Sequence, residues 1–336
     1  MSSAFGLLGR LYGMGAAARA SAYREGWFRR RKLPCPVVSV GNLTAGGTGK
    51  TPLVRWTVER LIQRGLRPGI LIRGYRRQRG PDAIVIPPKA GRAPLPREVG
   101  DEAAWLARVF PEVPIGVSAE RFRTGELVAA NYPVDVFVLD DGFQHLVLSR
   151  ELDVVVLDAT RPISDREILP AGLQREPCGA LARAGIVVMT RTEQADPAPL
   201  EAKVREFNSG APLIRARTRL DHLVATGGAV VTPDELIGRP VHAFCGIGNP
   251  DAFFRDLRLW GFDVVRESVF PDHHVYRDLS FARSGSVAAM VTTEKDLMNL
   301  AGLDLGALAV PVFACATRIE MVDAAVFDQA LFACVG

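Results

Sequence analysis

Residues 36–52 read Pro36-Val-Val-Ser-Val-Gly-Asn-Leu-Thr-Ala-Gly-Gly-Thr-Gly-Lys-Thr-Pro52, an apolar strand pattern that leads into a glycine-rich turn and then a helical pattern. This order is typical of a P-loop, in which glycines let successive backbone N–H groups converge on the phosphates of a nucleoside triphosphate. Lys50 is expected to reach the β- and γ-phosphates, and the Thr51 hydroxyl is expected to bind Mg²⁺. Thr44 stands where the strict pattern has its first glycine, so the loop is a variant. The predicted phosphate-binding residues are Gly46, Gly47, Thr48, Gly49, Lys50 and Thr51.

Two carboxylates follow a second apolar strand pattern. Residues 134–139 read Val-Asp-Val-Phe-Val-Leu, and Asp140 and Asp141 come next. P-loop proteins use acidic residues at such a strand end to hold Mg²⁺ or its water opposite the P-loop hydroxyl. Gly142 follows directly, so a solvated turn is the alternative interpretation. The pattern predicts a metal site at this strand end and leaves open which of the two aspartates contacts the ion.

The order of strand and helix patterns predicts an α/β fold. Helical patterns separate the apolar runs, which is typical of a mostly parallel sheet with helices on both faces. Past about residue 215 the pattern restarts, which predicts a smaller C-terminal α/β domain. We therefore expect an amphipathic, basic helical segment over 1–35, a P-loop core over 36–215 and the smaller domain over 216–336. The main predicted strands of the core are residues 69–73, 134–139, 152–157 and 185–189.

Composition narrows the class of protein. The chain has 336 residues, of which 48% are hydrophobic and 23% are charged, as in globular proteins with packed cores. A net charge of +4 gives no reason to expect a nucleic-acid partner. The five cysteines form no C-x-x-C pair, which favours a reducing compartment and argues against a structural metal. No apolar run reaches 18 residues, so no membrane-spanning helix is expected.

The N-terminal segment combines apolar residues at helical spacing with a cluster of positive charge. Phe5, Leu8, Leu11 and Tyr12 would share one helix face, and the aromatic and basic stretch 27–32 follows. Such a segment suits a helix that lies on an anionic bilayer surface, and it equally suits a helix packed on the protein's own core. A secretory signal is a weaker alternative, because the apolar stretch is short and is interrupted by a charge.

Two regulatory classes of P-loop protein fit the sequence poorly. A GTPase needs an N/T-K-x-D motif, and Thr293-Glu-Lys-Asp296 has these letters in another order. A partitioning ATPase carries lysine just before its Gly-Gly-x-Gly-Lys-Thr motif, and here that position is Ala45. A small-molecule kinase remains the main hypothesis, with a regulatory ATPase that acts on a membrane or protein partner as the alternative.

Several motifs together resemble the tetraacyldisaccharide 4′-kinase family, the lipid A kinases of Gram-negative bacteria. The most specific of them is the run Asp140-Asp-Gly-Phe-Gln-His145 beside this P-loop. The others are Val99-Gly-Asp-Glu102, Arg175-Glu-Pro177 and Asp272-His-His274. The resemblance runs from about residue 36 to the end and is densest before residue 180.

The resemblance implies an enzyme that transfers the γ-phosphate of ATP, with Mg²⁺, to the 4′-hydroxyl of a tetraacyldisaccharide 1-phosphate in lipid A biosynthesis. It implies an acylated disaccharide substrate and a peripheral position at the cytoplasmic face of the inner membrane. This favours membrane contact for the N-terminal helix, because an acylated substrate stays in the bilayer. No obligate protein partner is expected.

The resemblance also implies roles for individual residues. It matches Asp101 to the proposed catalytic carboxylate and His273, chosen over His274, to its partner, and it leaves open which of the pair takes the hydroxyl proton. It places Glu176 near the metal. Because Asp101 and His273 fall in different predicted domains, we expect the cleft between them to close on substrate binding. Candidate substrate contacts are Arg73, Gln144, His145 and Arg175.

One stretch departs from the family pattern. Members usually carry a small residue after Arg-Gly-Tyr, whereas Gly74-Tyr75 continues here into Arg76 and Arg77. These arginines either bind phosphate groups or form a solvated basic loop. The stretch Glu294-Lys295-Asp296 also matches the family, and a salt-bridged helix start is the default interpretation for it.

Overall fold

The computed structural model describes residues 2–78, 80–282, 286–300 and 302–335, without the side chains of residues 2–4 and 307. The chain forms two compact units. Unit 1 comprises residues 1–217 and 320–336, and unit 2 comprises residues 218–319. The final segment therefore belongs to unit 1, whereas the sequence patterns assigned everything after residue 215 to the smaller domain. Strands β8 (Leu213–Ala225) and β13 (Val312–Met321) carry the chain from one unit to the other.

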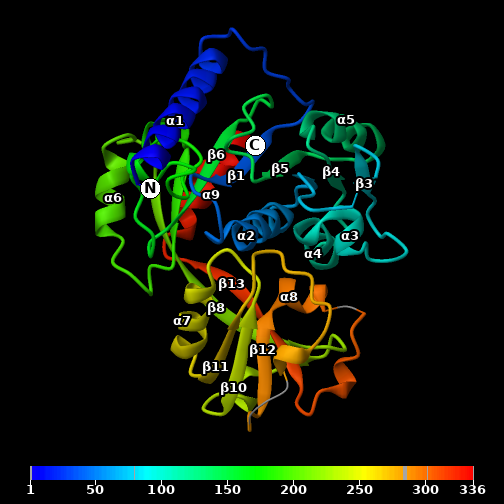
Figure 1. Cartoon of the computed structure of the whole chain (residues 1–336). Coiled ribbons are helices and arrows are strands. Elements are labelled where there is room, and N and C mark those ends of the chain that lie inside the picture. Colours follow the sequence, from blue (N-terminus) through cyan, green and yellow to red (C-terminus); the bar gives the residue numbers. More distant parts are fainter. Residues whose placement is uncertain (1, 79, 283–285, 301, 336) are drawn as a thin grey trace. The chain divides into compact units, whose positions relative to one another are not determined.

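Unit 1 is built on a mostly parallel sheet (Figure 1). Strand β1 lies at its centre between β5 and β6, and the edge strand β3 runs antiparallel to β4. The start of β8 pairs with β7 at the other side. In spatial order the strands are β7 (Ile186–Thr190), β6 (Leu152–Asp158), β1 (Val37–Asn42), β5 (Val136–Asp140), β2 (Pro68–Ile72), β4 (Ile115–Val117) and β3 (Ile84–Ile86).

Helices cover both faces of this sheet, with α5 on one side and α2 and α4 on the other (Figure 1). All residues of β1, β2, β5 and β7 are buried, which explains why these strands are continuous apolar runs without alternation. The α/β fold with a mostly parallel sheet is thus confirmed. The helices and 3₁₀ turns between the strands are α2 (Lys50–Gln63), α3 (Pro96–Val99), α4 (Asp101–Val109), α5 (Arg121–Asn131), α6 (Ala198–Arg205), η1 (Asp165–Glu167) and η2 (Cys178–Arg183).

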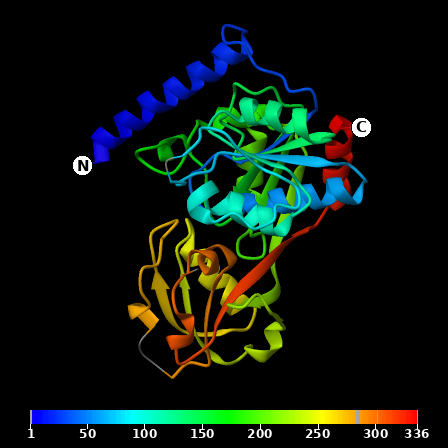
Figure 2. The same ribbon diagram turned by 90° about the vertical axis from the view of Figure 1, so that its right-hand side faces the viewer.

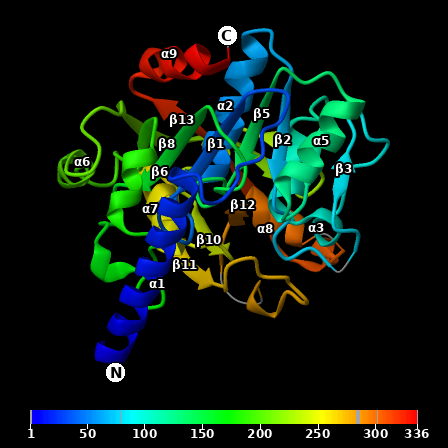
Figure 3. The same cartoon turned by 90° about the horizontal axis from the view of Figure 1, so that it is seen from above.

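The chain begins with the long helix α1 (Ser2–Arg24), which Figures 2 and 3 show as one continuous rod. It contacts the segment around η1, where Gly9 and Gly13 pack against Ile168. A Cβ on Gly9 would come within 2.9 Å of the Ile168 carbonyl oxygen, so this contact requires a residue without a side chain. A Cβ on Gly13 would meet Ile168 Cδ1 at the same distance, and the end of that side chain can shift. The helix also has a large exposed apolar surface formed by Phe5, Leu7, Leu8, Leu11, Tyr12 and Met14. Among the described helices, none combines the length and apolarity needed to cross a bilayer.

The C-terminal helix α9 (Ala324–Val335) packs on α2 within unit 1. Its Phe327 is fully buried and meets the Trp56 ring edge-on, with 4.8 Å between ring centroids. Arg60 of α2 forms an ion pair with Asp328 of α9, with 3.0 Å from Nε to Oδ1. The last element of the chain therefore completes the cover of the helix that starts at the P-loop.

Unit 2 is a smaller α/β unit. Its sheet includes parallel strands in the order β11 (Asp263–Val269), β10 (Pro240–Cys245), β12 (Ala289–Thr293) and β13, and β8 lies beside β13. The short strand β9 (Val230–Val231) pairs antiparallel with the end of β8. Its helical elements are α7 (Pro250–Leu259), α8 (Glu294–Asn299), η3 (Pro233–Glu235), η4 (Ser280–Ala282) and η5 (Leu305–Ala307).

Candidate active site

The glycine-rich loop connects the buried strand β1 to α2, as a P-loop does. Gly49, the residue before the helix, has a φ of 87°, a left-handed conformation that favours glycine. No side chain caps the helix start, so the first N–H groups of α2 are available to bind an anion. Asn42, at the end of β1, steadies the loop from inside: its Nδ2 donates to the Thr44 carbonyl and, over 2.9 Å, to the Thr48 hydroxyl.

The structure brings the predicted acidic pair next to this loop. Strand β5 runs parallel to β1, with Val40 opposite Asp140. The Lys50 ammonium lies 3.7 Å from Asp141 Oδ1, and Arg175 Nη1 donates to both oxygens of Asp141 over 2.7 and 2.8 Å. Burial alone would raise the pKa of Asp141, but the positive charges of Lys50 and Arg175 outweigh it and lower the pKa below its ordinary value. Asp141 is therefore a charged partner of the phosphate-binding lysine.

Asp140 lies in a different environment. It is buried, and burial together with the nearby charges of Asp141 and Glu102 raises its pKa to about 7. Among the described residues, no hydrogen-bond partner reaches its Oδ1. A buried carboxylate with an unsatisfied oxygen, at the end of the strand beside β1, fits Mg²⁺, which prefers oxygen ligands and is usually held by one or two carboxylates with phosphates. No group of three or more His, Cys, Asp or Glu side chains in the described parts of the chain has the arrangement of a protein-only metal site.

The shifted carboxyl predicts a pH-dependent effect on stability. The pKa of Asp140 is about 7 in the folded protein, against 3.8 unperturbed. Its ionisation therefore lowers the free energy of unfolding as pH rises from about 4 through about 7. Each pKa unit corresponds to about 1.4 kcal/mol. In Mg²⁺-free buffer, Asp140→Asn is expected to raise Tm by a few degrees, and by more at pH 8 than at pH 5. Differential scanning calorimetry at both pH values measures this.

Asp135→Asn is the control for this prediction. Its hydrogen bonds with Arg67 lower the pKa of Asp135, so this substitution is expected to leave Tm unchanged or lower it at both pH values. An Asp140→Asn gain in Tm of equal size at pH 5 and pH 8 would contradict a titration of Asp140 near neutral pH.

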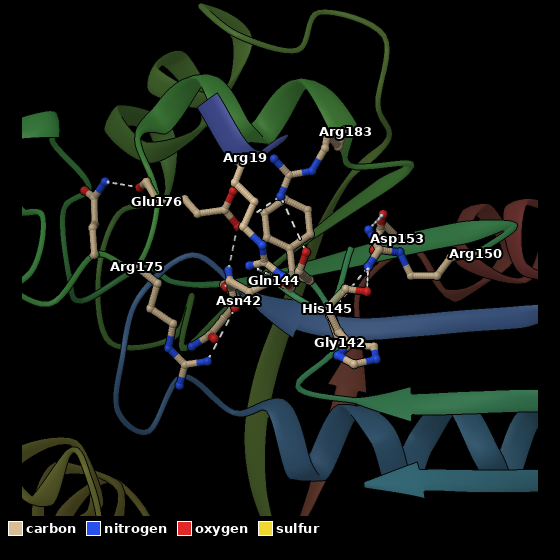
Figure 4. Close-up of polar contacts among 12 residues, drawn as sticks. Arg19, Asn42, Gly142, Gln144, His145, Arg150, Asp153, Arg175, Glu176 and Arg183 are labelled. Atoms are coloured by element: carbon tan, nitrogen blue, oxygen red, sulfur yellow. Dashed lines mark hydrogen bonds and ion pairs between the residues drawn. The ribbon is translucent and has the colours of Figure 1, made fainter. Parts of the chain in front are cut away.

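Glu176, predicted near the metal, lies in a polar network (Figure 4). Gln144 Nε2 donates to Glu176 Oε1 and to the Asn42 carbonyl, both over 3.0 Å, and Arg183 Nη2 donates to Glu176 Oε1 over 3.0 Å. Arg175 Nη1 also lies 3.4 Å from Gln144 Oε1. The Glu176 carboxylate is thus bound to Arg183, and Gln144 connects it to the ion pair of Arg175 and Asp141. The hydrogen bonds of this network, as far as the structure describes it, connect Glu176 to neither Asp140 nor Thr51.

His145 and an arginine that sequence reasoning missed lie in the same region. Burial, followed by the charges of Arg121, Arg150, Arg19 and Arg73, lowers the pKa of His145 to about 3, so the ring is neutral at ordinary pH. Arg121, the first residue of α5, is buried, and this burial lowers its pKa to about 10 against the attraction of Asp141 and Asp140. The sequence gives only a weak indication that Arg121 belongs to the site, because β4, the strand that precedes α5, has only three residues.

The predicted catalytic carboxylate, Asp101, is the first residue of α4. The residue before the helix is Gly100, with no side-chain cap, so Asp101 does not serve as the helix cap. Gly100 has a φ of 93°, and a Cβ there would come within 2.8 Å of the Tyr75 carbonyl. This close approach fixes the start of α4 against the Arg73–Tyr75 turn at the end of β2. Arg73 is exposed.

The departure from the family pattern has a local explanation. The Arg76 guanidinium lies 5.7 Å from the centre of the Tyr75 ring, and Arg77 Nη2 donates to the Asp82 carbonyl over 3.0 Å. Both extra arginines therefore have partners within their own loop.

His273 lies in unit 2, on the loop that follows β11. Its backbone N–H donates to the Gly246 carbonyl over 3.0 Å, and its φ is 59°. Its Nε2 is 3.4 Å from the Lys295 ammonium and 3.8 Å from Asp272 Oδ1. The ring of His274 instead stacks on Phe270, with 4.7 Å between centroids. The environment of His273 is therefore polar and charged, whereas that of His274 is aromatic.

Asp296 explains the Glu294-Lys295-Asp296 stretch. It is fully buried and accepts hydrogen bonds from the Gly246 N–H and the Tyr276 hydroxyl, each over 2.9 Å, and from the Thr293 hydroxyl over 2.6 Å. The Gly246 carbonyl in turn accepts from the backbone N–H of His273, so Asp296 links Gly246, which binds His273, to Tyr276 on the same loop as the histidine. The stretch forms a helix start, as expected, and Lys295 lies beside the candidate catalytic ring.

Fold and site together define the class of protein. A parallel α/β sheet with a P-loop after its central strand, and with carboxylates at the end of the neighbouring strand, is the arrangement of P-loop nucleoside triphosphate-binding proteins. Residues 1–335 match the family described as tetraacyldisaccharide-1-P 4′-kinase, and the chain belongs to this family. The resemblance drawn from the motifs is thereby confirmed.

Individual relatives agree with this family. A tetraacyldisaccharide 4′-kinase from Anaeromyxobacter sp. (strain Fw109-5) is 39% identical over 318 residues, which cover 92% of this chain and 84% of the relative. One from Halorhodospira halophila is 40% identical over 296 residues, covering 87% and 82%. The fold is similar to a crystal structure of LpxK from Aquifex aeolicus in complex with ATP, with a TM-score of 0.79, 30% identity and 98% of each chain covered.

Proposed function

We propose that this protein is an ATP-dependent kinase that transfers the γ-phosphate to the 4′-hydroxyl of a tetraacyldisaccharide 1-phosphate, a lipid A precursor. The observation that supports this most directly is the adjacent placement of Lys50 after β1 and Asp140–Asp141 after β5 in a chain of this family. Phosphoryl transfer needs positioning and charge stabilisation more than covalent chemistry, and this site supplies both.

The residues divide the work as follows. The N–H groups at the start of α2 and the Lys50 ammonium bind the phosphates, and Asp141 orients Lys50. Thr51 and Asp140 would hold Mg²⁺, which supplies charge neutralisation at the phosphates when bound. A base must accept the proton of the attacking hydroxyl, and Asp101 and His273 are the candidates. Arg175 and Gln144, which are bound to the same acidic network, would contact the phosphate or sugar groups of the substrate.

Transfer of label distinguishes this function from a regulatory ATPase. Purified protein incubated with γ-³²P-ATP, Mg²⁺ and a tetraacyldisaccharide 1-phosphate in detergent micelles is expected to yield labelled lipid, with little ATP hydrolysis when the lipid is omitted. Hydrolysis stimulated by a protein partner or by bare vesicles, without labelled lipid, would support the regulatory ATPase instead.

We further propose that α1 docks on the cytoplasmic face of the inner membrane. The exposed apolar residues Phe5, Leu7, Leu8, Leu11, Tyr12 and Met14 of α1 have exposed fractions of 46–68%. Trp27 and Phe28 follow them with exposed fractions of 79% and 51%. The basic cluster of residues 29–32 is exposed too. Exposed aromatic and aliphatic side chains next to positive charge are typical of helices that lie in an anionic interface.

A charge placed on this apolar surface tests the docking proposal. The double variant Leu8→Glu/Leu11→Glu is expected to lower binding to anionic phosphatidylglycerol vesicles at least about tenfold, because each buried leucine contributes about 1.5–3 kcal/mol. Vesicle flotation measures the bound fraction. Leu259→Glu is the matched control, since Leu259 is an exposed leucine (60%) on α7. Equal flotation of the double variant and the wild type would contradict docking through α1.

A further inference from the structure

Two residues, at and just after the end of β7, contact the P-loop. Strand β7 lies on the opposite side of β1 from β5, the strand that leads to Asp141, the partner of Lys50. The Thr190 hydroxyl, at the last residue of β7, donates to the Thr48 carbonyl over 2.9 Å. The guanidinium of the next residue, Arg191, donates through Nη1 to the Gly47 carbonyl over 3.0 Å. Two successive carbonyls of the phosphate-binding loop are therefore bound by two successive side chains from one strand end.

Arg191 is itself held by a buried carboxylate. Its Nη1 lies 2.5 Å from Oδ2 of Asp158, the last residue of β6, and the Asp158 side chain is 1% exposed. Oδ1 of Asp158 accepts from the N–H and the hydroxyl of Thr160, over 2.9 and 2.6 Å. The carboxylate is thus fixed by its own turn and fixes the guanidinium in place.

This arrangement is costly for the fold. Arg191 has a φ of 56°, which is unfavourable for a residue with a side chain, and its buried Nε has no hydrogen-bond partner in the part of the chain that the structure describes. A buried ion pair is seldom a net gain in stability over an apolar pair of the same volume. A strained residue with a desolvated charge that contacts a functional loop points to a role in that loop's conformation.

We propose that Arg191, fixed by Asp158, is a positioning residue for nucleotide binding: together with Thr190 it holds the Gly47 and Thr48 carbonyls away from the phosphates. A peptide group is planar and trans, so the carbonyl of Thr48 and the N–H of Gly49 point in opposite directions. Binding the carbonyl at Thr190 directs the Gly49 N–H away from β7, where it is free to bind an anion. This inference rests on the proposed nucleotide-binding function of the loop.

The test separates loop positioning from stability. Arg191→Met leaves Asp158 buried without its cation, so it is expected to lower both Tm and ATP affinity. The double variant Arg191→Met/Asp158→Asn removes both charges and is expected to recover Tm, while Mg²⁺·ATP affinity stays at least about tenfold below wild type. Affinity is measured by isothermal titration calorimetry, and Tm by calorimetry on the same samples.

Two further variants complete the experiment. Thr190→Val keeps the shape and removes the hydroxyl that donates to the Thr48 carbonyl and lies 3.3 Å from the Leu157 carbonyl, and it is expected to weaken ATP binding about 2- to 10-fold. Arg215→Met is the matched control, because Arg215 forms a surface ion pair with Glu201 and is expected to bind ATP as the wild type does. Amide hydrogen exchange at residues 46–51 without nucleotide is expected to accelerate in the Arg191 and Thr190 variants only.

The outcomes are distinct. Wild-type ATP affinity in the double variant, or unchanged exchange at 46–51, would overturn the inference. Binding of Mg²⁺·ATP by the wild type without transfer to lipid would instead count against the proposed kinase function and leave the role of Arg191 intact, since this test uses no lipid acceptor.

Discussion

Lys50→Met is expected to lower kcat for phosphate transfer by about 10²–10³-fold, the usual cost of removing one charge-stabilising donor from a reacting centre. Lys50 begins α2, and its ammonium lies 3.7 Å from Asp141, so Asp141 holds it over the phosphate-binding loop. The fold is expected to survive, because Arg175 still pairs with Asp141 when Lys50 is absent. Single-turnover transfer of ³²P to the lipid measures the effect.

Lys203→Met is the control for this variant. Lys203 pairs with Glu206 on the surface of α6, so its replacement is expected to leave kcat unchanged. Near-normal transfer by Lys50→Met, with an unchanged circular dichroism spectrum, would contradict the assignment of the loop at residues 46–51 as the catalytic phosphate site.

Asp101→Asn is expected to lower kcat by about 10²–10⁴-fold, the range for loss of a positioned acid or base. The side chain keeps its shape and loses its charge. Asp101 lies in the first turn of α4, directly after Gly100, where its charge also interacts favourably with the helix dipole, worth about 0.3–1 kcal/mol. Steady-state kinetics at saturating ATP and lipid give kcat, and thermal unfolding gives the structural share.

Asp251→Asn provides the matched comparison, since Asp251 lies in the first turn of α7 and interacts with a helix dipole in the same way. A small loss of Tm without loss of kcat is expected for it. The same pattern in Asp101→Asn would mean that Asp101 stabilises α4 and does not take part in proton transfer.

Much of the fold was predictable because the central strands are fully buried. Residues 152–157 and 185–189 were expected as strands and form β6 and β7 within one residue at each end. The short strands β3 and β4 were missed, since three residues carry too little pattern to separate a strand from a loop. The sequence also could not predict that α9 packs in unit 1, because its partners Trp56 and Arg60 are far away in sequence.

In the candidate site, too, local sequence patterns were predictable, whereas contacts made by the tertiary fold were not. The P-loop and Asp140–Asp141 were identified because each is a local pattern at a strand end. Arg121, Arg191 and Asp158 were missed, because their importance lies in burial and in contacts across the sheet, and a single arginine after a strand gives no signal of either. The different environments of Asp140 and Asp141 likewise arise from partners such as Arg175 and Glu102 that the tertiary fold supplies.

The chain order of the two units has a consequence for biosynthesis. Unit 2 is an insertion in unit 1, whose last helix, α9, leaves the ribosome after all of unit 2. The start of α9 lies 261 residues (324 − 63) beyond the end of α2. At about 5–20 residues per second, α2 would wait roughly 13–52 s for the helix that covers Trp56. During that interval a nascent chain holds a complete glycine-rich loop with an uncovered apolar helix behind it. We therefore expect chaperones to bind such a chain, because unit 1 is not complete until α9 has been synthesised.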